Sequence, residues 1–115
     1  MSELNWISHS ARNATIVNID GQDYILKDIA RSGGANYYIH QKDSIIFIGY
    51  IVEVSEGLLY KAVVEVFDID DPVAYDEQHD LIHSITCVEE YGIKRYTKAI
   101  TAVENLMEKT LKEIT

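Results

Sequence analysis

The apolar side chains of the last twenty residues recur every three or four positions, and this spacing constrains the fold more than any other feature of the sequence. Between Tyr96 and Ile114 the apolar residues share one side of a helical projection, while mainly charged and polar residues occupy the opposite side. The pattern predicts an amphipathic helix of about five turns. Because its apolar stripe must be buried, the rest of the chain has to provide a matching apolar face.

Most of the preceding sequence has the composition of β-strands. Runs rich in β-branched residues at 14–19 and 22–27 flank Asp20-Gly21. This dipeptide predicts a hairpin, because both central positions of a type I′ turn need a positive φ. Further strands are expected at residues 36–40 and 81–88, with a connector at residues 27–35 and a polar turn at residues 41–44.

The most apolar segment, residues 45–54, predicts a central strand because apolar residues occupy both of its alternating sides. Gly49 inside this strand predicts a bulge or a close neighbour, either a ring or a backbone segment. Residues 55–57 have the length and the glycine of a hairpin loop. The chain then resumes a strand pattern at residues 58–67, which the aspartates and the proline of residues 68–72 end.

Together these elements predict a single α+β domain over residues 1–115. We expect an antiparallel β-sheet of four to six strands, with one long C-terminal amphipathic helix packed on one face. A chain of 115 residues with 47% apolar residues can bury one core without disulfides. Pro72 is the only proline, and the sequence has no linker-like stretch that would mark a domain boundary.

The charge of the chain is concentrated in one segment. The formal net charge is -9, and residues 65–90 contain nine acids and no base, while the other residues carry ten acids and ten bases. An excess of acid argues against direct binding to nucleic acid. Two interpretations stay open: a solvated loop that keeps the protein soluble, or an acidic face that docks a basic partner surface. The residues of that candidate face are Asp68, Asp70, Asp71, Asp76, Glu77 and Asp80.

The same segment holds two histidines, His79 and His83, with carboxylates around them. These are suitable ligand types for a metal. On a helix, side chains four positions apart can share a metal, whereas along a strand they lie about 13 Å apart. The strand expected at residues 81–88 therefore weakens the metal interpretation, which remains an alternative.

Lys94, Arg95 and Lys98 crowd the start of the C-terminal helix, where the positive end of the helix dipole disfavours cations. The simplest interpretation is local pairing with Glu89 and Glu90. The functional alternative is an anion-binding site at the start of the helix.

No pair of residues close together in the sequence indicates nucleophilic catalysis, and only the fold could bring His9, His40 or His79 to a nucleophile. His83 is four positions from the only cysteine, Cys87, too far along a strand to activate its thiol. A single cysteine and an N-terminus without a basic and an apolar region favour a cytoplasmic protein. No apolar run reaches the ~18 residues that a membrane-spanning helix needs.

The sequence therefore favours a small, acidic, non-catalytic interaction protein without a cofactor. The partner we expect is a protein with a basic surface of the kind that binds nucleic acid, so that the chain would act as an inhibitor or accessory protein. The alternative is a small-molecule-binding or metal-dependent enzyme that uses His79 and His83. Eight tyrosines and the apolar strands also suggest a homodimer with tyrosines at the contact.

Overall fold

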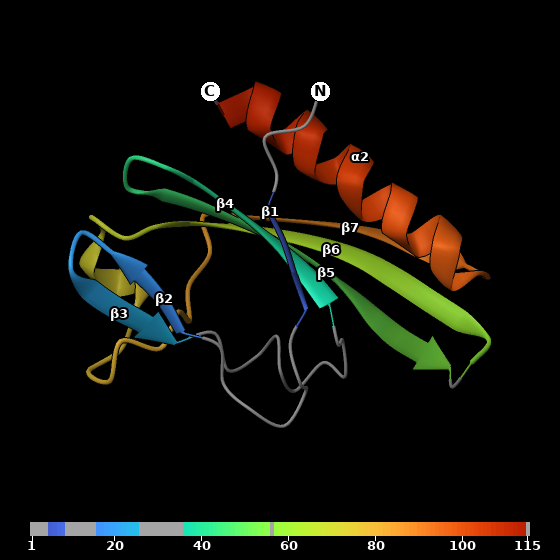
Figure 1. Cartoon of the computed structure of the whole chain (residues 1–115), viewed down its shortest axis with the longest axis horizontal. Coiled ribbons are helices and arrows are strands. Elements are labelled where there is room, and N and C mark those ends of the chain that lie inside the picture. Colours follow the sequence, from blue (N-terminus) through green and yellow to red (C-terminus); the bar gives the residue numbers. More distant parts are fainter. Residues whose placement is uncertain (1–4, 9–15, 26–35, 56, 115) are drawn as a thin grey trace.

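The computed structural model describes residues 5–8, 16–25, 36–55 and 57–114, and it has the predicted α+β fold (Figure 1). A five-stranded antiparallel sheet has the strand order β1-β4-β5-β6-β7, and β2 and β3 form a separate hairpin. In the described part of the chain, no helix is long and apolar enough to cross a membrane. The elements are β1 (Asn5–Ser8), β2 (Ile16–Ile19), β3 (Gln22–Ile25), β4 (Asn36–Lys42), β5 (Ile45–Ser55), β6 (Leu59–Asp68), the short 3-10 helix η1 (Pro72–Ala74), β7 (Thr86–Ile93) and α2 (Tyr96–Ile114).

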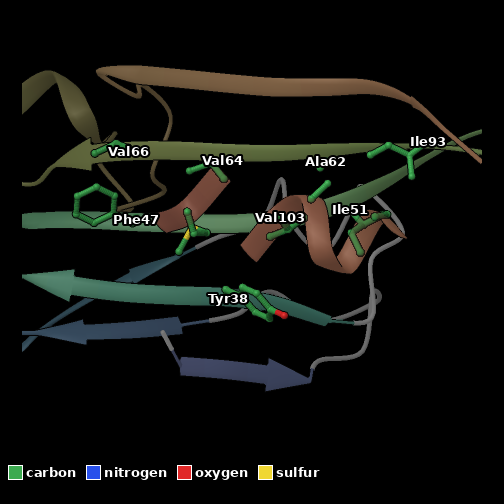
Figure 2. Close-up of a cluster of buried hydrophobic side chains, with 11 residues drawn as sticks. Tyr38, Phe47, Ile51, Ala62, Val64, Val66, Ile93 and Val103 are labelled. Carbon is green, nitrogen blue, oxygen red and sulfur yellow. The ribbon is translucent and has the colours of Figure 1, made fainter. Parts of the chain in front are cut away.

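The C-terminal helix has the predicted bounds and lies across one face of the sheet (Figure 1). Its buried residues pack on β5 and β6, with fewer contacts to β7. Figure 2 shows this cluster of buried side chains between the helix and the sheet. The members with the largest side chains are Tyr38, Phe47, Ile51, Ile93 and Met107.

Strand β5 is the central strand, as its apolar sequence predicts. Phe47 and Ile51 face the helix, whereas Ile46 and Ile48 belong to a second core on the opposite face. Gly49 marks a close neighbour and not a bulge, but this neighbour is a pair of aliphatic side chains and not the ring or backbone segment that the sequence predicts. A Cβ atom at this position would lie 2.8 Å from Cγ1 of Val103 and 3.0 Å from Cγ and Sδ of Met107, so the side chains of α2 occupy the space.

The opposite face of the sheet is covered in part by the β2–β3 hairpin and by the chain between β6 and β7 (Figure 1). The hairpin turn has φ values of 52° at Asp20 and 88° at Gly21, which confirms the predicted left-handed turn. Ile19 and Tyr24 point from the hairpin into the second core. Its sheet and loop members include Ile39, Ile46, Ile48, Val63, Phe67, Ile69 and Leu81.

The strand predicted at residues 81–88 is wrong in its position. The observed strand β7 starts at Thr86 and ends at Ile93. Leu81 instead donates a backbone hydrogen bond to the carbonyl of Ile25, at 3.0 Å, and is buried in the second core. Its apolar character therefore reflects contact with the β2–β3 hairpin. The residues after Val88 join the sheet although they are mostly exposed, because β7 lies at the edge of the sheet.

Other boundaries differ by a few residues. Strand β4 continues to Lys42, so the turn before β5 is confined to Asp43 and Ser44. Strand β6 ends at Asp68, where the aspartates and the proline begin. The predicted connector at residues 27–35 and the outer ends of the first two predicted strands lie outside the described residues.

Candidate functional site

Within the acidic stretch of residues 65–90, the six acids of the predicted docking face span residues 68–80, which we call the acidic segment. This segment lies mostly between β6 and η1 and in the loop after η1 (Figure 1). It belongs to the end of the sheet where β6 stops and β7 starts. Asp70, Asp71 and Glu77 are exposed, whereas Asp68, Asp76 and Asp80 are half-buried. All six acids predicted for a docking face therefore belong to one connected segment, but they differ in how much of the carboxylate reaches solvent.

Three of the aspartates order the backbone of the segment. The Oδ1 atom of Asp68 accepts a hydrogen bond from the backbone N–H of Asp70 at 3.0 Å, and Oδ1 of Asp71 accepts one from Val73 at 3.2 Å. The Oδ1 atom of Asp76 accepts two, from Gln78 at 2.9 Å and from Asp80 at 3.0 Å. Aspartate favours such turns because its short side chain reaches the N–H two positions on. The sequence predicts a turn at residues 68–72 but not the hydrogen bonds that Asp76 accepts.

Main-chain hydrogen bonds attach the segment to the rest of the fold. The N–H of Ile69 donates to the carbonyl of Ser44 at 3.0 Å, and the N–H of Ile25 donates to the carbonyl of His79 at 2.8 Å. Buried Ile69 and Leu81 anchor the two ends in the second core. The acidic segment is thus held by the turn before β5 at one end and by strand β3 at the other.

The fold brings further acids to this end of the molecule. Asp20, in the β2–β3 turn, acts together with Asp70 and Tyr75 on Tyr24, whose pKa is raised first by burial and then by these neighbours. Asp43 precedes Ser44, the residue that accepts the hydrogen bond of Ile69. Both aspartates are exposed. They are far from the segment in sequence, so only the tertiary structure reveals them. Lys42, the last residue of β4, is exposed next to Asp43 and offsets one charge.

His79 lies in a cluster of rings. Its ring stacks on that of Tyr75, with centroids 5.1 Å apart and planes at 12°, and meets Tyr24 edge-on at 5.6 Å. His83 is exposed, and its N–H donates to the carbonyl of Ala74 at 3.3 Å. Among the described residues, no group of three or more histidine, cysteine and carboxylate side chains is placed to hold a metal ion. Metal binding by His79 and His83 stays a prediction.

Lys94, Arg95 and Lys98 are exposed at the other end of the sheet, where β7 ends and α2 begins (Figure 1). The carbonyl of Arg95 accepts the first helical hydrogen bond, from Ala99 at 3.0 Å. Glu89, one of the two expected partners of this basic group, is engaged elsewhere, because its Oε2 atom lies 3.0 Å from Nζ of Lys61. The structure therefore separates the basic group from the acidic segment by the length of β6 and β7.

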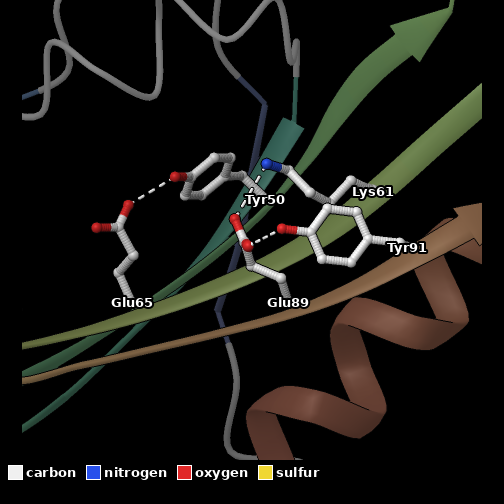
Figure 3. A network of polar contacts seen from close by, with 5 residues as sticks. All are labelled: Tyr50, Lys61, Glu65, Glu89 and Tyr91. Carbon is white, nitrogen blue, oxygen red and sulfur yellow. Dashed lines mark hydrogen bonds and ion pairs between the residues drawn. The ribbon is translucent and has the colours of Figure 1, made fainter.

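Three polar contacts lie on the face of the sheet opposite α2 (Figure 3). The hydroxyl of Tyr50 donates to Oε2 of Glu65 at 2.6 Å. Glu89 accepts from the hydroxyl of Tyr91 and pairs with Lys61, whose Nζ also lies 5.3 Å from the centroid of the Tyr91 ring. The hydrogen bonds from Tyr91 and Lys61 lower the pKa of Glu89, and the bond to Glu89 raises the pKa of Lys61.

Cys87 is exposed on β7. Packing around its thiol raises its pKa, and the charges of Glu65 and Glu89 raise it further. A raised pKa reduces the fraction of thiolate, which is the reactive form. Cys87 therefore lacks the environment of an activated nucleophile.

No protein-family model matches this chain, and neither the curated proteins nor the solved structures yield a match.

Proposed function

We propose that the chain is a non-catalytic interaction protein, an inhibitor or accessory protein, that docks a basic partner surface through the acidic segment. The observation that carries this proposal is the combination of charge and order in one exposed loop. Carboxylates that stay fixed relative to one another present a defined pattern of charge, which a flexible acidic tail does not.

The hydrogen bonds of Asp68, Asp71 and Asp76 support this view. Each uses one carboxylate oxygen to hold a turn, and the negative charge of the group is retained. Exposed Asp70 and Glu77 add charge without being needed for these turns. Asp20 and Asp43 extend the same acidic surface from two other parts of the chain.

The partner is defined by its chemistry. A surface that binds the phosphate backbone of nucleic acid carries closely spaced arginine and lysine side chains. Closely spaced carboxylates can pair with such side chains, and arginine pairs with a carboxylate in a bidentate geometry. The acidic segment would therefore compete with nucleic acid for the same basic surface.

The test uses a nine-residue oligo-arginine peptide as a minimal basic probe. The segment variant combines Asp70→Asn, Asp71→Asn, Asp76→Asn and Glu77→Gln. Asparagine keeps the acceptor oxygen that holds each turn, so folding should be preserved. We expect the affinity of the peptide to fall at least about tenfold, since several charge-assisted contacts are lost together.

A matched control changes the same number of charges elsewhere, with Glu53→Gln, Glu104→Gln, Glu108→Gln and Glu113→Gln. These glutamates are exposed on β5 and α2, outside the acidic segment. Both variants have a formal net charge of -5, four less negative than the wild-type -9. If the two variants lose affinity equally, the net charge alone determines binding and the segment is a solubilising loop. The same conclusion follows if the wild type does not bind the probe.

A further inference from the structure

Strand β7 presents an open sheet edge. Within the described part of the chain it pairs with β6 alone, at the end of the strand order. A regular run of pairs joins Thr86 to Val66 and continues to Glu90 opposite Ala62, before the register shifts. Many sheet edges are protected by a bulge or by a residue with positive φ. In β7 these features occur only near its C-terminal end, where the register shifts and Gly92 has a φ of 75°. At least five residues of β7 can therefore accept another strand.

The side chains of this edge favour one kind of strand over others. Glu89 and Glu90 are exposed on opposite faces of β7, and the segment 65–90 contains no base. The adjoining exposed side chains are apolar or aromatic, with Ile85 52% exposed and Tyr91 65% exposed. A strand that pairs here gains from basic side chains near the glutamates and from apolar side chains near the two ends.

The same charges disfavour a second copy of the chain. Two β7 strands paired about a twofold axis near Glu89 or Glu90 would bring four glutamates together, and like charges opposite one another destabilise a ladder. A register that moves the glutamates apart shortens the regular part of the pairing. Charge complementarity thus selects a basic occupant.

On its inner side, β7 already binds a lysine side chain from β6. Lys61 lies diagonally across from Glu89, places Nζ 3.0 Å from its carboxylate, and lies over the ring of Tyr91 at 5.3 Å (Figure 3). Lys61 covers one face of that ring, and the 65% exposure of Tyr91 leaves the other face open to solvent. A cation on the open side of β7 would find the second face of the ring, in a contact that is favourable for lysine and arginine.

From this geometry we infer that β7 binds an extended basic segment of a partner protein, which joins the sheet as a sixth strand. Its main chain pairs with the outer edge of β7, with one basic side chain near Glu90 on one face of the sheet and another near Tyr91 on the opposite face. This surface is separate from the acidic segment, so the inference stands or falls independently of the proposed function.

The test uses a blocked eight-residue peptide in which pairs of lysines alternate with pairs of valines, so that each face of the strand carries both kinds of side chain. We expect hydrogen exchange of the backbone amides of residues 86–91 to slow when the peptide binds, with little change in residues 68–80. A second peptide of the same sequence, methylated at every backbone nitrogen, keeps the charge but cannot donate to a ladder, because it has no backbone N–H. It should bind at least about tenfold more weakly.

The matched variants are Glu90→Lys on β7 and Glu53→Lys on β5, which change the net charge equally and replace exposed residues. Glu90→Lys should lower the affinity for the lysine–valine peptide at least about tenfold, and Glu53→Lys should lower it much less. Equal effects of the two variants, or equal binding of the two peptides, would overturn the inference. So would absent binding, or protection that appears only in residues 68–80, which would support the proposed function instead. Protection of β7 that grows with protein concentration, without peptide, would assign the edge to a second copy.

Discussion

The packing of α2 on the sheet predicts an unusual sign for the substitution Gly49→Ala. In a strand that is not crowded, alanine is more stable than glycine by about 0.5–1 kcal/mol, because glycine loses more backbone entropy on folding. Here the added Cβ atom would lie 2.8 Å from Cγ1 of Val103 and 3.0 Å from two atoms of Met107. Val103 is 1% exposed and Met107 is 0% exposed, so neither side chain can move into solvent.

The change in the free energy of unfolding is the difference between the entropic gain of alanine and the cost of overpacking. Overpacking by one carbon atom costs about 1–3 kcal/mol, since unstrained carbon atoms pack at about 3.5–4.0 Å. After the entropic gain of alanine, we expect a net loss of about 1–2 kcal/mol in the free energy of unfolding. Urea denaturation of the wild type and of Gly49→Ala measures this difference directly.

A double-mutant cycle tests the cause of the loss. Val103→Ala removes the nearest atom, and by itself should cost about 2 kcal/mol. The combination Gly49→Ala with Val103→Ala should be more stable than the sum of the single effects predicts, by at least about 0.5 kcal/mol. If Gly49→Ala is more stable than the wild type, α2 does not press on β5 at this point and the reasoning is refuted.

The burial and contacts of single residues give two further predictions, and the tyrosine content gives a third. Val103→Asp should unfold most of the population, because the side chain at this position is 1% exposed and would carry an unpaired charge into the core. Leu106→Asp should destabilise the fold less, because Leu106 is half-buried. Equal thermal midpoints for the two variants would contradict this packing. The Tyr91 and Lys61 contacts lower the pKa of Glu89 below its ordinary value of 4.5, so they stabilise the fold above that pH and stop doing so as the pH falls through the lowered pKa. Glu89→Gln should therefore cost up to about 1 kcal/mol at neutral pH, and the difference in chemical denaturation should vanish once the pH falls below the lowered pKa. A constant difference would show that the charge of Glu89 is not responsible. The homodimer expected from the tyrosine content stays a prediction, and light scattering at high micromolar concentration that gives a particle of 13.1 kDa would refute it.

The elements with a periodic buried face could be predicted from the sequence. Helix α2 shows its apolar stripe at every turn, and the β2–β3 turn needs the positive φ that Asp20-Gly21 allows. Strand β7 was misplaced because an edge strand exposes most of its side chains, so residues after Val88 carry no apolar alternation. The apolar residues before it, such as Leu81, serve a contact with the hairpin that has no local signal.

The charge of the acidic segment could be predicted from the sequence, but the hydrogen bonds that order it and the acids that the fold adds to it could not. Whether an aspartate holds a turn, as Asp76 does, depends on the local backbone that forms around it. The addition of Asp20 and Asp43 depends on the tertiary structure, since they come from two other turns. Composition can therefore locate the acidic segment, whereas only the fold shows that its backbone is ordered and that other acids lie beside it.

The salt dependence of the association rate tests docking through the acidic segment most directly. Stopped-flow mixing with the oligo-arginine peptide would measure this rate at increasing salt for the wild type, the segment variant and the matched control variant. Exposed charges steer association over about a Debye length of 8–10 Å, so the rate should fall steeply with salt where the charges face the partner. We predict a steep slope for the wild type and for the control variant, and a slower, flatter response for the segment variant. Equal rates and slopes for all three proteins would contradict docking through residues 68–80.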